Sequence, residues 1–90
     1  MLFECHITLN LSDKEIGEEV AKELHWKTSE IERDPVLGKD SYFYLTTHEN
    51  DYVRIYDKMK YTVSELDEHF GVRVVREKIE LIMYDTKVKV

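Results

Sequence analysis

The sequence predicts an α+β fold, in which a four-stranded antiparallel sheet carries two helices on one of its faces. Segments with an apolar residue at every second position alternate along the chain with segments that repeat one every three or four positions. The signals for turns and helix ends fall between these segments. Because 90 residues can build one modest core, we expect a single domain over residues 1–90.

The first half of the chain is predicted to form a strand, a helix and a second strand. Residues 2–11 alternate apolar and polar side chains, as a half-buried strand does. Ser12 and Glu15 form a capping-box pattern, which predicts the start of a helix. Apolar residues at helical spacing continue to about His25. Residues 27–34 are a weaker strand candidate, followed by turn residues.

The second half repeats the pattern in the order strand, helix, strand. Residues 41–47 are rich in aromatic and β-branched residues and predict a strong strand. Residues 48–51 offer acidic and capping side chains to a helix over residues 52–70, with Gly71 suited to its C-terminal end. Residues 72–85 are the last predicted strand.

The resulting β-α-β-β-α-β order is the ferredoxin-like arrangement, with an expected strand order of 4-1-3-2 and right-handed crossovers. The first strand is then central. The helices must pack on the apolar sides of the strands, which predicts a core from Phe3, Cys5, Ile7, Leu9, Phe43, Leu45, Val75, Ile79, Leu81 and Met83, with Glu77 as an exception.

Composition excludes several classes of partner. The formal net charge is −6, so we expect no bulk nucleic acid partner, although a local basic spot could hold one small anion. No apolar run approaches the ~20 residues of a membrane span, and no signal peptide precedes the first strand, so we expect a soluble, cytoplasmic protein. The single cysteine, Cys5, excludes an internal disulfide and is expected to be a small buried hydrophobe.

The face of the sheet opposite the helices is predicted to be unusually rich in chemistry-bearing side chains. Of the four histidines, His25 and His69 fall at predicted helix C-termini, where a cation suits the helix dipole. His6 and His48 have no such structural role. The predicted open face comprises Glu4, His6 and Thr8 from the first strand, Tyr42, Tyr44, Thr46 and His48 from the third, and Arg76, Lys78, Glu80 and Tyr84 from the fourth.

Four interpretations of this face remain open at the level of sequence. It could bind a phosphorylated or carboxylated small molecule and act on it, or bind such a molecule without turnover. It could hold a metal through His6, His48 and either Glu4 or Glu80, although the spacing is not diagnostic, so no metal or cofactor is assigned. It could also be a plain dimer interface, since small open sheets often pack on a second copy, and we expect a homodimer.

Residues 6–8 have the form His-x-Thr, and in this respect the chain resembles the two-histidine phosphoesterases, which cleave or ligate phosphodiesters. That family carries two such motifs on related halves of a longer chain, whereas this chain has one, and His48 does not begin a second. Two copies would have to join to present two motifs. The resemblance implies that His6 is an acid or base and that Thr8 holds a phosphate oxygen.

The chain also resembles a group of small uncharacterised bacterial and phage proteins over nearly its whole length. These proteins open with a Phe-Glu-Cys-His-Ile/Val-Thr stretch like residues 3–8. They share a Thr-x-His-like segment followed by Asp-Tyr, as in residues 46–52, and a Lys-Ile-Glu segment, as in residues 78–80. The resemblance supports the domain boundaries and the motifs and implies no particular reaction.

Together these observations predict a site for an anionic small molecule, such as a nucleotide, centred on His6. His6 is expected to transfer a proton, and Glu4 or Glu80 to orient its imidazole. Arg76 and Lys78 are expected to hold the anion. The predicted catalytic residues are His6, Thr8 and Glu4, and the predicted ligand-binding residues are Tyr44, Thr46, His48, Arg76, Lys78 and Glu80.

Overall fold

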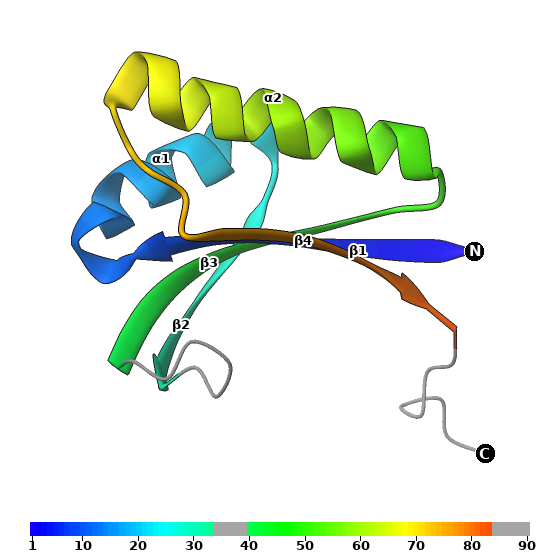
Figure 1. Cartoon of the computed structure of the whole chain (residues 1–90), viewed down its shortest axis with the longest axis horizontal. Helices are drawn as coiled ribbons and strands as arrows, with labels where there is room; N and C mark the ends of the chain where they lie inside the picture. The colour runs from blue at the N-terminus through cyan, green and yellow to red at the C-terminus, as the bar shows by residue number, and fades with distance from the viewer. Residues whose placement is uncertain (34–39, 84–90) are drawn as a thin grey trace.

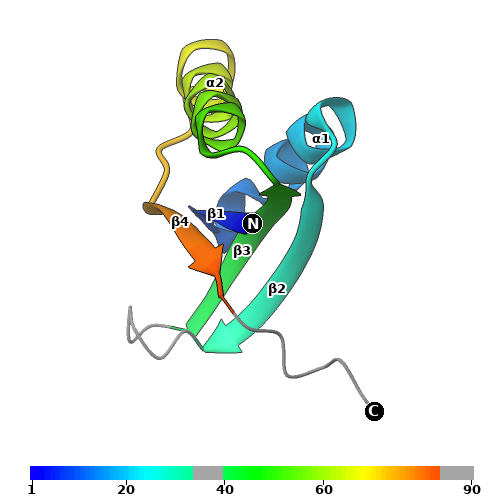
Figure 2. The same ribbon diagram turned by 90° about the vertical axis from the view of Figure 1, so that its right-hand side faces the viewer.

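The computed structural model describes residues 1–33 and 40–83. Its elements follow the order β1 (Leu2–Asn10), a 3₁₀ turn η1 (Leu11–Asp13), α1 (Lys14–Leu24), β2 (Lys27–Arg33), β3 (Asp40–Glu49), α2 (Tyr52–Phe70) and β4 (Arg76–Ile82). Both helices lie on the same side of the sheet, as Figures 1 and 2 show. In the described part of the chain, neither helix is long and apolar enough to cross a membrane.

The four strands form one antiparallel sheet in the order β2-β3-β1-β4, which is the predicted order read from the other edge. β1 is therefore central, with β3 on one side and β4 on the other (Figure 2). In the register, His6 lies opposite Thr46 on β3 and opposite Lys78 on β4. The site residues that were expected on three separate strands are thus neighbours.

The predicted boundaries need three corrections. The third strand extends through His48 and Glu49, which were predicted to precede the second helix as capping residues. The other two lie at the start of the first helix and in the last strand. The first helix begins at Lys14 rather than at Ser12, because a 3₁₀ turn precedes it and the amide of Lys14 donates to the carbonyl of Leu11. The Ser12–Glu15 capping box therefore does not open this helix. Residues 72–75 are not part of the last strand, which starts at Arg76. Of the predicted strand's end, residues 84 and 85 lie outside the described residues.

Residues 72–75 instead form the connection between the C-terminal end of α2 and β4. Gly71 has a φ of 65°, in the left-handed region that glycine tolerates best, and its amide donates to the carbonyl of Asp67. The amide of Val72 donates to the carbonyl of Leu66, 2.9 Å away, and the Val72 side chain is buried. A buried apolar residue just after a helix end stabilises that end by packing against the last turns.

The core lies between the helices and the apolar side of the sheet. Cys5, Ile7 and Leu9 from β1 are fully buried, which confirms the predicted facing of the central strand. The predicted core was wrong at its margin: Leu81 is 39% exposed, and Val75 and Met83 are exposed too. β4 is an edge strand, so its side chains are covered less. The full core cluster is Cys5, Ile7, Leu9, Val20, Ala21, Trp26, Phe43, Leu45, Ile55, Met59, Leu66 and Val72.

Candidate functional site

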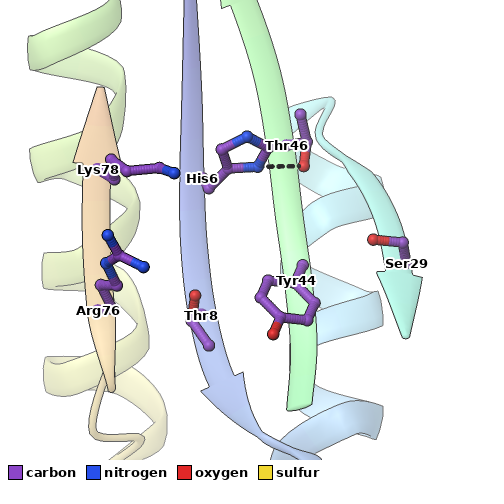
Figure 3. A pocket seen from close by; sticks show the side chains of 7 residues that line it. All are labelled: His6, Thr8, Ser29, Tyr44, Thr46, Arg76 and Lys78. Carbon is purple, nitrogen blue, oxygen red and sulfur yellow. Dashed lines mark hydrogen bonds between the residues drawn. The ribbon is translucent and has the colours of Figure 1, made fainter. Parts of the chain in front are cut away.

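The open face of the sheet carries a shallow hollow of about 210 Å³ near its centre. Side chains from all four strands line it, and Figure 3 shows them on the same side of the sheet. The lining residues are His6, Thr8, Ser29, Tyr44, Thr46, Arg76 and Lys78. All seven side chains are polar, two of them are cations, and none of these described lining residues is a carboxylate. The hollow therefore suits a ligand that accepts hydrogen bonds or carries negative charge.

His6 is held by one hydrogen bond at each ring nitrogen. Its Nε2 lies 2.9 Å from Glu4 Oε1, and its Nδ1 lies 2.9 Å from Thr46 Oγ1 (Figure 3). An ionised carboxylate can only accept hydrogen bonds, so Nε2 carries a proton and donates it to Glu4. In the neutral imidazole Nδ1 is then the acceptor, and the Thr46 hydroxyl donates to it. The basic nitrogen of His6 thus faces Thr46 and the hollow.

Glu4 bridges the two histidines of the open face. Its second carboxylate oxygen lies 2.8 Å from Nε2 of His48, which donates to it. Partial burial of Glu4 favours the neutral form, but the hydrogen bonds and positive charge of His6 and His48 outweigh it and lower the pKa of Glu4. Glu4 is therefore ionised near neutral pH, as the hydrogen-bond directions require.

The two cations of the hollow differ in their pairing. Nζ of Lys78 lies 3.4 Å from Glu80 Oε1, so part of its charge is already balanced. Arg76 is half-buried, and it has no hydrogen-bond or ion-pair partner among the described residues. A guanidinium withdrawn from water without a counterion is unfavourable, and binding an anion would relieve that cost.

The structure separates the predicted site residues into two neighbouring groups. His6, Thr8, Tyr44, Thr46, Arg76 and Lys78 line the hollow. Glu4, His48 and Glu80 do not line it, and they lie in register with one another one step along the sheet. Glu80 Oε1 is 3.8 Å from Nε2 of His6. The carboxylates of Glu4 and Glu80 are thus placed to interact with His6 rather than with a ligand in the hollow.

Several residues of the open face differ from what the sequence led us to expect. Thr8 and Tyr44 are only 3% and 7% exposed, so they form the floor and wall of the hollow rather than a free surface. Tyr42 is buried as well, and Tyr84 lies outside the described residues. Sequence reasoning missed Ser29. Alternation along β2 places Ser29 on one face of the strand, but its position opposite Tyr44 depends on the register between β2 and β3.

Glu4, His6 and Glu80 also have the donor set of a metal site, because one ligand atom from each lies within 4.8 Å of the others. Two features of the same atoms favour an acid–base role instead. His6 Nε2 already donates to Glu4, and Lys78 Nζ lies 3.4 Å from the Glu80 oxygen that a cation would share. We therefore assign no metal to this cluster.

Cys5 takes no part in the site. It is fully buried on the helix side of β1, and burial, with a contribution from Glu77, raises the pKa of its thiol to about 12. A thiol with this pKa is protonated at neutral pH and is a poor nucleophile. The expectation that Cys5 is a small core residue is confirmed.

His25 and His69 lie at helix ends, as expected. His25 is the C-terminal cap of α1, with a φ of 65°. Nδ1 of His69 lies 2.9 Å from Glu65 Oε1, one turn earlier on α2. Neither lines the hollow.

Comparison with family models, with curated proteins and with solved structures finds no match for this chain.

Proposed function

We propose that the hollow binds a small phosphorylated or carboxylated molecule, such as a nucleotide, and that His6 transfers a proton to or from it. The observation that carries this proposal is a polar lining with two cations and no carboxylate among its described residues, in which the half-buried Arg76 has no described partner. The chain as a whole carries a net charge of −6, so two cations without a carboxylate among the described lining residues are a specific feature of the hollow.

Each lining residue has a role that follows from its chemistry. The planar guanidinium of Arg76 suits two oxygens of one anionic group, and the ammonium of Lys78 acts as a point charge. The hydroxyls of Thr8 and Ser29 can donate to further oxygens, whereas the Thr46 hydroxyl donates to His6 Nδ1. The ring of Tyr44 forms an apolar wall for the uncharged part of the ligand.

The pairing of His6 with Glu4 supports turnover over simple binding. A carboxylate that accepts from one nitrogen of an imidazole fixes the tautomer and stabilises the imidazolium that forms when the other nitrogen takes a proton. A site that only holds an anion gains nothing from a fixed basic nitrogen. Binding without turnover uses the same lining residues and is the alternative that the kinetic experiment below decides.

The first experiment measures anion binding and its dependence on Arg76. Isothermal titration of the wild-type chain with inorganic phosphate and with adenosine monophosphate should give saturable binding. Arg76→Gln should weaken it at least about tenfold, since a charge-assisted hydrogen bond contributes roughly 1.5–3 kcal/mol. Arg73→Gln is the matched control, because Arg73 is exposed in the connection before β4 and loses the same charge.

Equal affinity for phosphate in Arg76→Gln and Arg73→Gln would contradict the proposal, because binding would then depend only on net charge. The second experiment incubates the wild-type chain and His6→Gln with a panel of nucleotides, cyclic phosphodiesters and carboxylic esters, read for product. Product from the wild type alone supports an acid–base role for His6. Binding without product in both supports the holding alternative.

The ferredoxin-like topology and the homodimer also stay predictions. Tyr42 and Tyr44, which lie on the face that a second copy would cover, are already buried within one chain. Sedimentation equilibrium at high micromolar concentration measures this directly. A monomer would also remove the idea that two copies combine two His-x-Thr motifs.

A further inference from the structure

We propose that Thr46 is a nucleophile, activated by His6 and Glu4, which accepts an acyl group from an ester whose anionic part lies against Arg76. The inference rests on the proposed function for the anionic part alone. The nucleophile is a separate assignment, which neither the His-x-Thr motif nor the composition of the face predicted.

The geometry is a continuous row of three groups across two strands. Thr46 Oγ1 lies 2.9 Å from His6 Nδ1, and His6 Nε2 lies 2.9 Å from Glu4 Oε1. A hydroxyl, an imidazole and a carboxylate joined in this order form the constellation that activates serine and threonine in nucleophilic catalysis. In other enzymes it is recognised by geometry and roles rather than by sequence order.

The environment of each group agrees with its role in this row. Glu4 is the orienting group, and its other oxygen is held by His48 at 2.8 Å, so the carboxylate cannot turn freely. His6 is half-buried, which limits competition from water for Nδ1. Thr46 is partly exposed and lines the hollow together with Arg76 and Lys78, so its oxygen faces the space where a ligand would lie (Figure 3).

Acyl transfer fits this row better than phosphoryl transfer does. Phosphoryl transfer depends mainly on positioning and on charge that neutralises the phosphate, and the hollow would need no activated alcohol for it. Attack on an ester carbonyl needs a strengthened nucleophile and a donor for the oxyanion. Thr46 with His6 meets the first need, and we assign the second to the ammonium of Lys78, which lines the same hollow and points toward His6 in Figure 3.

The reaction balances with water as the only co-substrate. Thr46 Oγ1 forms a bond to the carbonyl carbon while its proton passes to His6 Nδ1. The bond between that carbon and the leaving oxygen breaks, and His6 returns the proton to the leaving alcohol. Water then attacks the acyl-threonine, gives a proton to Nδ1, and releases the acid as that proton returns to Thr46. Glu4 stays ionised throughout and stabilises the imidazolium.

The test uses the full chain and an anionic activated ester, mono-4-nitrophenyl succinate, with neutral 4-nitrophenyl acetate for comparison. Nitrophenolate release is followed by absorbance. The reaction is quenched in acid and the acyl group is located by intact-mass and peptide-mapping mass spectrometry. We expect a succinyl group on Thr46, and a preference for the anionic ester that Arg76→Gln removes.

Variants at position 46 separate a nucleophile from a residue that only positions His6. Thr46→Ser should keep the acyl group on residue 46. The nearly isosteric Thr46→Val should lose it and slow nitrophenolate release by roughly a hundredfold or more. Thr28→Val is the matched control, because Thr28 is exposed and lies opposite Leu45, on the helix side of the sheet. Circular dichroism of each variant checks that it is folded.

The proposal is overturned if Thr46→Val releases nitrophenolate at the wild-type rate, or if the wild type neither exceeds the uncatalysed rate nor acquires an acyl group on Thr46. Phosphate titration of the same samples keeps the two proposals apart. Phosphate binding without Thr46 acylation leaves the proposed function standing and removes the nucleophile. Acylation of Thr46 without any phosphate binding does the reverse.

Discussion

The chemical role of His6 depends on which of its two ring nitrogens carries the proton. Composition does not reveal this, but the hydrogen bonds of the ring do. Glu4 accepts from Nε2, so neutral His6 should be the Nε2–H tautomer, and the same holds for His48, which donates to Glu4 through its own Nε2. His69 should differ, because its Nδ1 donates to Glu65. Long-range proton–nitrogen correlation spectra at mildly alkaline pH report the tautomer of each ring. A uniform tautomer at all three residues would contradict the assigned hydrogen bonds.

Glu4 also predicts a pH dependence of stability. Partial burial acts to raise the pKa of this carboxyl, but the hydrogen bonds and the charge of His6 and His48 together outweigh it, so the folded state lowers that pKa. The lowered pKa stabilises the folded chain above the unfolded-state pKa of about 4.3, and this contribution is lost as the pH falls through the folded-state pKa.

In Glu4→Gln this contribution is absent at every pH. The free energy of unfolding of the variant should therefore decrease less than that of the wild type as the pH is lowered below about 5. Urea unfolding at a series of pH values measures both curves. Parallel curves would show that Glu4 has the same pKa in the folded and unfolded states.

At the scale of the element, α1 shows how packing overrides helix propensity. Gly17 lies within this helix, where alanine is intrinsically preferred by about 1 kcal/mol. A Cβ at this position would lie 2.8 Å from the Phe43 ring and 2.9 Å from a methyl group of Leu9. The glycine thus allows the helix to approach the sheet closely.

We therefore predict that Gly17→Ala destabilises the chain. The overpacking should cost about 1–3 kcal/mol. The higher helix propensity of alanine offsets about 1 kcal/mol of that cost. Chemical denaturation of the variant and the wild type gives the difference in the free energy of unfolding. A companion Gly17→Ala, Phe43→Leu variant should recover part of the loss, since the smaller side chain makes room. If Gly17→Ala alone were more stable than the wild type, the gain in helix propensity would exceed the cost of overpacking.

At the scale of the whole molecule, the two faces of the sheet set which substitutions damage the fold. Ile7 is fully buried at the centre of β1, whereas Leu81, on the edge strand β4, is 39% exposed. Ile7→Ala should cost roughly 2–5 kcal/mol, and Leu81→Ala should cost well under that, although both residues were predicted to be core. Urea midpoints of the two variants test this order. Equal losses would contradict the assignment of β4 to the edge.

Much of the fold could be predicted from local patterns. Alternation in residues 2–11 and 41–47 placed the two central strands and oriented their faces, because a strand with one buried side must put apolar residues at every second position. Helical spacing over residues 52–70 and the glycine that follows located α2. Residues 72–75 were mistaken for strand, since a valine-rich connection that packs on a helix end has the same composition as a strand.

The sequence by itself determined which side chains share a face of each strand, and so named His6, Thr46, Arg76 and Lys78 as members of one surface. Only the tertiary structure decided that His6 joins Glu4 and Thr46, that Arg76 has no described partner, and that Glu4, His48 and Glu80 lie beside the hollow rather than in it. The physical reason is that the side-chain period of a strand is local, whereas register is a relation between strands distant in the chain. A shift of two residues keeps every face and changes every neighbour.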